Sequence, residues 1–270
     1  MARGTRAHPP VLKRLGQHFL TDQSALNAIA DALTPAPQDA VIEIGPGRGS
    51  LTDLLAARAQ RLTVIEIDHA LADNLRDRYR TSGNVTVIED DVLKVDVGAL
   101  AGGPFVVAGN VPYYITTPIL FHVLRPPFPR HAVFLVQREV GERIVASPGS
   151  RTYGALSVTV QAFSDATIVR HVPATAFRPP PKVESSIVRI TPRVQGLIMP
   201  AEVEPFRVFV QAAFGMRRKQ MVNVLRAVRR MAPADASAML EAAGLDPHAR
   251  PETLSPSQFV TLMRMSPSGP

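Results

Sequence analysis

Residues 40–49 read AVIEIGPGRG, a five-residue apolar run that leads into a loop with three glycines. Val and Ile favour a buried strand, and the glycines let the backbone turn tightly and approach a ligand closely. Residues 51–59 then have helical spacing, so the segment predicts a strand–loop–helix unit of the kind that binds nucleotides. No Gly-Lys-Ser/Thr follows, which excludes a Walker loop, and the third glycine comes one residue too early for the dinucleotide pattern.

Similar apolar runs follow this segment along the chain. Val- and Ile-rich runs lie at residues 62–67, 85–88, 105–108 and 132–136, separated by helical stretches such as 71–79. Strands that alternate with helices predict an α/β protein with a mostly parallel, Rossmann-like sheet covered on both faces. Two later runs, residues 166–172 and 186–190, are close enough in sequence to pair antiparallel at one edge.

The pattern changes after Pro192, where only helical spacing remains. Helices are predicted at residues 204–214, 217–231, 234–243 and 255–265. We therefore expect a catalytic domain over residues 1–200, beginning with a basic arm at 1–20, and a small all-α domain over residues 201–270.

The composition narrows the class of protein. Of the 270 residues, 46% are hydrophobic and 20% are charged, as in a globular protein with a real core. There is no cysteine, which excludes disulfides, thiolate nucleophiles and thiolate zinc sites. No apolar run is long enough for a membrane span and the first residues lack a signal-peptide core, so a cytoplasmic protein is expected. The net charge of +7 suits a polyanionic partner.

Acidic residues follow the second and third predicted strands. Glu66 lies about 20 residues beyond the glycine loop, where a carboxylate can accept hydrogen bonds from two ribose hydroxyls. Asp91, at the end of the third strand, can accept one from an adenine amino group. Since ligands of parallel sheets bind at the carboxyl ends of strands, Gly45, Gly47, Glu66 and Asp91 should share one crevice. S-adenosylmethionine fits such a crevice, although each acid taken alone can equally be a helix cap.

The fourth strand ends in Asn110-Val111-Pro112-Tyr113, which suits an amine nucleophile such as N6 of adenine. The lone pair of that nitrogen is delocalised into the ring, which weakens it as a nucleophile. The nitrogen becomes more nucleophilic when the Asn110 amide oxygen and the Pro112 carbonyl accept hydrogen bonds from its two N–H groups. Tyr113 offers a flat face to a base that has left its helix. No strong general base is required, so none of the seven histidines is given a catalytic role, and no metal site is predicted.

Together, EIGPGRG and NVPY resemble the ribosomal RNA adenine dimethyltransferases, and the similarity extends over nearly the whole chain. Residues 16–20, GQHFL, resemble the family's GQNFL segment, which implies that His18 and Leu20 contact the cofactor, with His18 replacing the usual Asn. Asn110 is also expected to touch the cofactor. Residues 177–183, FRPPPKV, resemble a further family segment. This implies that Phe177 stacks opposite Tyr113 and that Lys182 lies near the RNA backbone.

Basic residues are concentrated early in the helical region. Between residues 205 and 230 there is no acid, and the basic residues are Arg207, Arg217, Arg218, Lys219, Arg226, Arg229 and Arg230. We interpret this as a phosphate-binding surface, with Arg217, Arg218, Lys219 and Arg226 as the RNA contacts. The segment at 214–219, FGMRRK, resembles the FxxRRK of the small-subunit branch of the family. The resemblance implies dimethylation of two adjacent adenines in the 3′-terminal hairpin of small-subunit rRNA, either as naked RNA or in an immature small subunit. We also expect the enzyme to be a monomer.

Three other functions are considered. The large-subunit branch, whose members confer macrolide-type resistance, would use the same chemistry on 23S rRNA. A non-catalytic RNA-binding or ribosome-assembly factor could keep the scaffold without the reaction. A nicotinamide dehydrogenase would need the longer glycine spacing and a substrate acid or base, and it has no use for Asn-x-Pro-Tyr.

Overall fold

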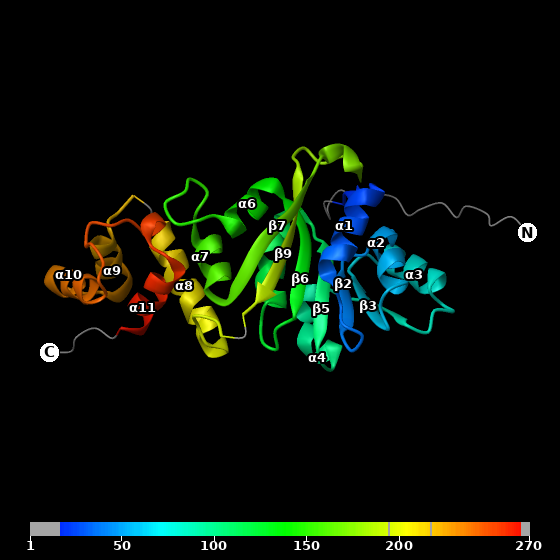
Figure 1. Cartoon of the computed structure of the whole chain (residues 1–270), viewed down its shortest axis with the longest axis horizontal. Helices are drawn as coiled ribbons and strands as arrows, with labels where there is room; N and C mark the ends of the chain where they lie inside the picture. Colours follow the sequence, from blue (N-terminus) through cyan, green and yellow to red (C-terminus); the bar gives the residue numbers. More distant parts are fainter. Residues whose placement is uncertain (1–16, 194, 217, 266–270) are drawn as a thin grey trace, which may run out of the picture. The chain divides into compact units, whose positions relative to one another are not determined.

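The computed structural model describes residues 17–193, 195–216 and 218–265 (Figure 1). Contacts within the described chain form two compact units. Unit 1 contains residues up to Gly141 and residues 167–191, and unit 2 contains residues 142–166 and those from Pro192 onward. We describe each unit by itself.

Unit 1 is built on a sheet with the strand order β4-β3-β2-β5-β6-β9-β7 among the described residues. Strands β2 (Ala40–Ile44), β3 (Arg61–Glu66), β4 (Val85–Glu89), β5 (Phe105–Asn110) and β6 (His131–Gln137) run parallel, and β9 (Ser185–Pro192) is antiparallel to β6. Strand β7 (Ser164–Val172) is at the edge next to β9. The chain leaves β2 toward β3 and later returns to β5 on the other side, so a topological switch point lies between β2 and β5.

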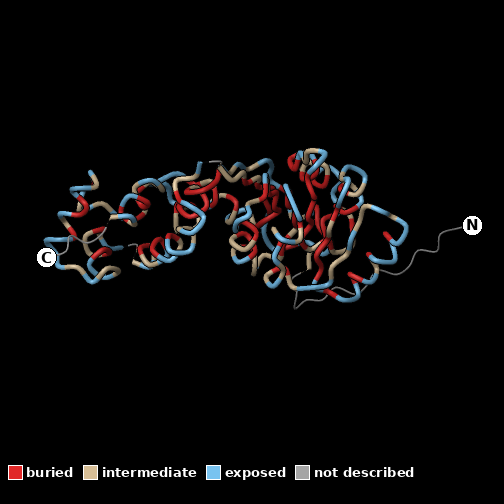
Figure 2. Tube along the Cα trace, turned by 90° about the horizontal axis from the view of Figure 1, so that it is seen from below, coloured by how far each residue is buried: buried red, intermediate tan, exposed pale blue. Residues whose placement is uncertain are grey.

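Both faces of this sheet are covered. On one face, helices α1 (Gln23–Leu33), α2 (Ser50–Ala56) and α3 (His69–Arg78) pack in a common core with Val41 and Val106. Side chains alternate along a strand, so Ile42 and Val107 point to the opposite face, and they too are fully buried. Figure 2 shows buried residues concentrated in the interior of this unit and exposed residues around its periphery. The predicted α/β fold with a Rossmann-like sheet is therefore confirmed.

The connections on the second face are short helices. They are α4 (Val97–Ala101), which contacts β2, and α5 (Thr116–Val123), which follows the NVPY segment after a 3-10 turn at Tyr113–Ile115. Helix α6 (Arg138–Val145) follows β6 directly.

A separate two-stranded sheet joins distant parts of unit 1. Strand β1 (Phe19–Leu20) pairs antiparallel with β8 (Phe177–Arg178), so that Leu20 is opposite Phe177. The backbone N–H of Thr21 continues this pairing with a 2.8 Å hydrogen bond to the Ala176 carbonyl. These two strands have no signal in the local sequence, because each has two residues and forms only through its distant partner.

Unit 2 is helical in the part that the structure describes. It contains α7 (Ala155–Phe163), α8 (Val203–Gly215), α9 (Met221–Arg229), α10 (Pro233–Ala242) and α11 (Pro256–Arg264). Buried Phe206, Phe209 and Phe259 form its centre, and the Tyr153 hydroxyl donates to the Leu254 carbonyl at 2.8 Å. Helix α7 thus groups with helices that follow it by many residues. The functional boundary at residue 200 stays a prediction.

The helix predicted over residues 217–231 is wrong at its beginning. Helix α9 starts at Met221, after Gln220 in an extended conformation (φ −68°, ψ 153°). Arg218 and Lys219 lie in the turn before it, and Arg217 lies outside the described residues. Arg and Lys have high helix propensity, so Arg218 and Lys219 fit the helical pattern of the sequence, although the backbone forms a turn there. No helix in the described ranges has the length and apolarity needed to cross a membrane.

Candidate active site

A single cavity lies at the carboxyl ends of the central strands of unit 1. Its wall contains seven residues that the sequence analysis assigned to cofactor binding: His18, Leu20, Gly45, Gly47, Glu66, Asp91 and Asn110. Pro112 and Tyr113 line the same cavity. The structure therefore brings together residues from the N-terminal segment, the glycine loop and the ends of three strands.

The glycine loop depends on glycine at its cavity-lining positions. Gly45 and Gly47 have φ angles of +66° and +57°, in the left-handed region that L side chains rarely adopt. A Cβ atom on Gly47 would lie 3.0 Å from ring atoms of Phe19. The loop backbone is thus open to the cavity and closely covered by strand β1.

Glu66 is fixed by two backbone N–H groups. Its Oε2 accepts a 3.0 Å hydrogen bond from Gly47, and its Oε1 accepts one of the same length from Asp68. Burial raises the pKa of the Glu66 carboxyl, while these two bonds oppose the rise. Each carboxylate oxygen has a second lone pair, so both can still accept a hydroxyl hydrogen.

Asp91 is both a helix cap and a cavity residue. Its Oδ1 accepts a 3.0 Å hydrogen bond from the Leu93 N–H at the start of the 3-10 turn Val92–Lys94. The Oδ2 atom takes no part in this cap. The capping interpretation that the sequence left open is therefore correct for one oxygen, and the other remains for a ligand.

The Asn110 amide has a defined orientation. Its Nδ2 lies 3.0 Å from the His18 carbonyl, which can only accept, so the amide nitrogen faces His18 and Oδ1 is left as an acceptor. The Pro112 carbonyl is less available, because it already accepts from the Ile115 N–H and the Thr116 hydroxyl, each at 3.1 Å.

Tyr113 is held by its hydroxyl and lies beside an imidazole. The hydroxyl is 2.5 Å from Ser185 Oγ, and burial raises the pKa of the phenol. The His18 ring is near-parallel to the Tyr113 ring, with centroids 6.1 Å apart and an interplanar angle of 22°. His18 Nδ1 lies 2.8 Å from the Pro179 carbonyl, so this nitrogen carries the hydrogen.

Two residues implied by the resemblance do not line this cavity. Phe177 is fully buried, together with Leu20 and Val172, in the core that contains α1, α2 and α3. Lys182 is exposed and outside the cavity wall. A stacking role for Phe177 therefore requires the β8 segment to move.

A model of the ribosomal RNA adenine dimethylase family matches residues 11–266 of the chain. The chain belongs to this family. This confirms the resemblance seen in the sequence and, with it, an enzyme that methylates adenine in rRNA with S-adenosylmethionine as its cofactor.

Several curated proteins resemble this adenine dimethylase at similar levels. The chain is 43% identical over 254 residues to ribosomal RNA small subunit methyltransferase A of Acidobacterium capsulatum, covering 93% of this chain and 89% of that protein. It is 42% identical over 260 residues to the protein of the same name from Xanthomonas campestris, covering 94% and 95%.

Two solved structures share the fold over most of their length. A dimethyladenosine transferase from Plasmodium falciparum matches with a TM-score of 0.78 at 26% identity, covering 91% of this chain and 96% of that one. The 23S rRNA methyltransferase ErmE matches with a TM-score of 0.72 at 29% identity, covering 91% and 98%.

Several residues that line the cavity of this adenine dimethylase are not among those predicted from the sequence. Gln17 Nε2 donates to Asp68 Oδ2 at 2.9 Å, which ties the N-terminal segment to the start of α3. Ile67 lines the cavity and is 55% exposed, and Tyr114 also lines it. Ile67 directly follows the acid at the end of β3, and that position is a signal that could have identified it.

Five of the basic residues between positions 205 and 230 fall into two groups in the dimethylase. Arg218, Lys219 and Arg226 are exposed. Arg207 is instead paired with Glu204, and Arg229 donates to the carbonyls of Leu262, Met263 and Met265 at the end of α11. Arg207 and Arg229 therefore have structural partners within unit 2.

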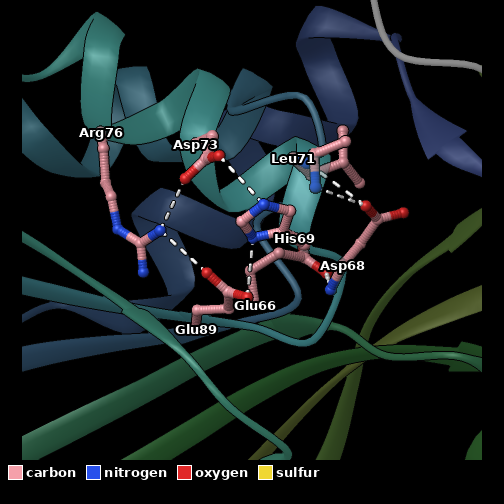
Figure 3. Close-up of polar contacts among 8 residues, drawn as sticks. Glu66, Asp68, His69, Leu71, Asp73, Arg76 and Glu89 are labelled. Carbon is pink, nitrogen blue, oxygen red and sulfur yellow. Dashed lines mark hydrogen bonds and ion pairs between the residues drawn. The ribbon is translucent and has the colours of Figure 1, made fainter.

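One side-chain group of the dimethylase has metal-ligand spacing. His69, Asp73 and Glu89 lie close together on the surface of unit 1 (Figure 3). Arg76 donates to Asp73 at 2.7 Å and to Glu89 at 2.9 Å, so its guanidinium already compensates the charge of both carboxylates. We assign no metal role to this group.

Proposed function

We propose that this protein transfers methyl groups from S-adenosylmethionine to N6 of two adjacent adenines in the 3′-terminal hairpin of small-subunit rRNA, giving N6,N6-dimethyladenosine. The observation that carries the proposal is the cavity in which the glycine loop, Glu66, Asp91 and Asn110 meet. The choice of the small subunit is supported by the curated relatives, since those at 43% and 42% identity bear small-subunit names, whereas the 23S enzyme ErmE is 29% identical.

The residues present fit the proposed methyl donor. The glycine loop can approach it closely, Glu66 can accept hydrogen bonds from its ribose hydroxyls, and Asp91 Oδ2 can accept one from its adenine amino group. Ile67 and Leu20 offer apolar surface, and His18 and Gln17 cover the cavity from the N-terminal segment. When bound there, the donor supplies an activated methyl group on a positively charged sulfur.

Asn110 is the main acceptor for the target amine. With its nitrogen committed to the His18 carbonyl, Oδ1 can accept one N–H and orient the nitrogen lone pair. The Pro112 carbonyl becomes a second acceptor if the Thr116 hydroxyl rotates away from it. No proton has to be removed before attack, because the amine becomes acidic only after the methyl group is transferred.

The target base is held by stacking on Tyr113, a type of contact that contributes roughly 1 to 3 kcal/mol per base. The Ser185 contact fixes the phenol ring in place. Phe177 serves as the opposite face once β8 is displaced from its present packing, and Lys182 contacts the RNA backbone nearby.

Unit 2 supplies further phosphate contacts. We assign these to Arg218, Lys219 and Arg226, whose side chains are exposed, together with Arg217, which lies outside the described residues. The enzyme works as a monomer in the cytoplasm on immature small subunits. This setting suits a cysteine-free, basic chain that acts on rRNA.

The test uses small subunits from cells that lack this protein. Incubation with the purified enzyme and radiolabelled S-adenosylmethionine should label the small-subunit RNA, and primer extension should stop at two adjacent adenines near its 3′ end. Labelling of 23S RNA instead would identify a large-subunit enzyme. Tight binding to subunits with no methyl transfer would identify an assembly factor.

A further inference from the structure

One ionisable group in the cavity wall has no part in the mechanism above. Glu43 lies in the middle of β2, where its neighbours on the flanking strands are Val64 and Ala108. It is 1% exposed, yet it borders the cavity, and its Oε2 has no hydrogen-bond partner among the described residues. An unsatisfied buried polar atom is costly, so its retention beside a ligand cavity points to a partner that arrives with the ligand.

In the part of the chain that the structure describes, the groups that face Glu43 supply no positive charge to pair with it. Glu66 on β3 and Asp53 on α2 both act on it as negative charges. Asp53 itself accepts hydrogen bonds from Arg78 and from the Tyr79 hydroxyl at the C-terminal end of α3. The positive charge of Arg78 is therefore paired with Asp53.

The remaining described neighbours are neutral or contact another group. The Thr52 hydroxyl of α2 is close to the carboxyl. Arg48 of the glycine loop places its guanidinium over the Phe19 ring, 4.3 Å from the centroid. Helix α1 contributes only Leu26 and Ile29 to the cavity wall, and β5 contains no titratable residue.

Such surroundings favour the neutral acid. Burial raises the pKa of Glu43 to about 8, the negative charges of Glu66 and Asp53 add to the rise, and the Thr52 hydroxyl opposes it. Glu66 differs, because two backbone N–H groups donate to its oxygens and stabilise its ionised form. Near neutral pH, Glu43 therefore keeps its proton.

We propose that Glu43 is a proton-coupled counter-charge of the cofactor cavity: it is a neutral carboxylic acid while the cavity holds no cation, and it releases its proton to solvent when the positively charged methyl donor binds. The inference rests on the proposed function, since it requires that S-adenosylmethionine occupies this cavity. Its sulfonium and ammonium groups outweigh its one carboxylate, so it brings a net positive charge.

The proton balance closes over one reaction cycle. On donor binding, the O–H bond of Glu43 breaks and the proton passes to water, leaving a carboxylate beside a cation. After methyl transfer the sulfur is neutral, so the carboxylate loses its partner and takes a proton back from water. No electron is gained or lost. Glu43 thus favours the charged donor over its uncharged-sulfur product and helps the product to leave.

Isothermal titration calorimetry tests this directly. Donor binding is measured at about pH 7 in phosphate and in Tris, whose ionisation enthalpies differ, so that the difference in heat counts the released protons. We expect close to one proton for S-adenosylmethionine and for its cationic amine analogue sinefungin, and none for S-adenosylhomocysteine. The donor Kd should fall about tenfold per pH unit as the pH rises toward the pKa of Glu43.

The decisive variant is Glu43→Gln, which keeps the size of the side chain and cannot ionise. It should bind the donor without proton release and with a Kd that is constant across neutral pH. Asp53→Asn is the matched control, because it removes a neighbouring carboxylate that already has partners, and it should keep most of the release. Undiminished release in Glu43→Gln, no release in the wild type, or equal release with S-adenosylhomocysteine would overturn the proposal.

A second measurement covers the case in which Glu43→Gln does not fold. Infrared difference spectra of the wild-type enzyme with isotope-labelled glutamate should lose a carboxylic-acid band when the donor binds and keep it with S-adenosylhomocysteine. A band that persists with the donor contradicts the proposal. If S-adenosylmethionine does not bind at all, the proposed function fails instead.

Discussion

The cofactor cavity of unit 1 and the basic stretch of unit 2 look alike as sequence signals but differ as structures. The cavity residues are spread over almost 100 positions, yet the parallel sheet brings them to one place. The basic residues lie close together in sequence, yet Arg207 and Arg229 are engaged within unit 2 while Arg218, Lys219 and Arg226 are exposed. Residues that the topology of the sheet brings together therefore identify a site better than residues that are merely close in sequence.

The largest effect is expected for Asn110→Ala, which removes the acceptor on which the cavity's chemistry depends. Turnover should fall about 100-fold or more, because the amine loses its orientation, while donor affinity should show only a modest loss. Single-turnover methyl transfer and calorimetry separate the two quantities. Full activity in this variant would show that the cavity residues do not form a reaction site.

Glu66→Ala should weaken donor binding by roughly 10- to 100-fold, since hydrogen bonds to a charged group contribute about 1.5 to 3 kcal/mol. Glu89→Ala is a matched control: this acid ends the neighbouring strand but pairs with Arg76 and His69 outside the cavity wall. Both variants are compared by calorimetry. Equal affinities would place the ribose away from Glu66.

Arg229→Met should lower the free energy of unfolding by about 2 kcal/mol, because three carbonyls at the end of α11 lose a charged donor. Urea denaturation measures this loss. The salt dependence of RNA binding should stay as in the wild type. A changed salt dependence with unchanged stability would instead add Arg229 to the RNA contacts.

Arg226→Ala is the counterpart of the preceding variant and should have the smallest effect. Loss of one phosphate contact should reduce the slope of log K against log salt by about 1, with stability unchanged. Its one hydrogen bond among the described residues, to Asn223 at 3.1 Å, is on the surface and contributes little. An unaltered slope would place Arg226 outside the RNA contacts.

The sheet could be predicted because its signals are local. Val- and Ile-rich runs, glycines at the β2 turn and acids at strand ends each act within a few residues, and parallel strands then align their ends. The β1–β8 sheet could not be predicted, since Phe19 and Leu20 become a strand only through residues 177–178.

Prediction of the candidate site from the sequence had the same limit. The sequence placed Asn110 and Glu66 near a ligand, but it could not show that Pro112's carbonyl is already used twice or that Phe177 is buried in a core. Nor could it show that Arg229 has structural partners, because the carbonyls that Arg229 contacts lie more than 30 residues away. Such facts depend on long-range packing, which residue spacing does not record.

The pairing of β1 with β8 also sets the time at which the cavity is completed on the ribosome that makes this chain. His18, Phe19 and Leu20 are synthesised early, but the partners that hold them, Ala176 to Pro179, emerge only after most of unit 1 has left the exit tunnel. A nascent chain that ends before these residues would have the glycine loop and Glu66 without their cover. We therefore expect stalled chains to acquire the ability to retain the methyl donor abruptly, when this last short strand becomes available.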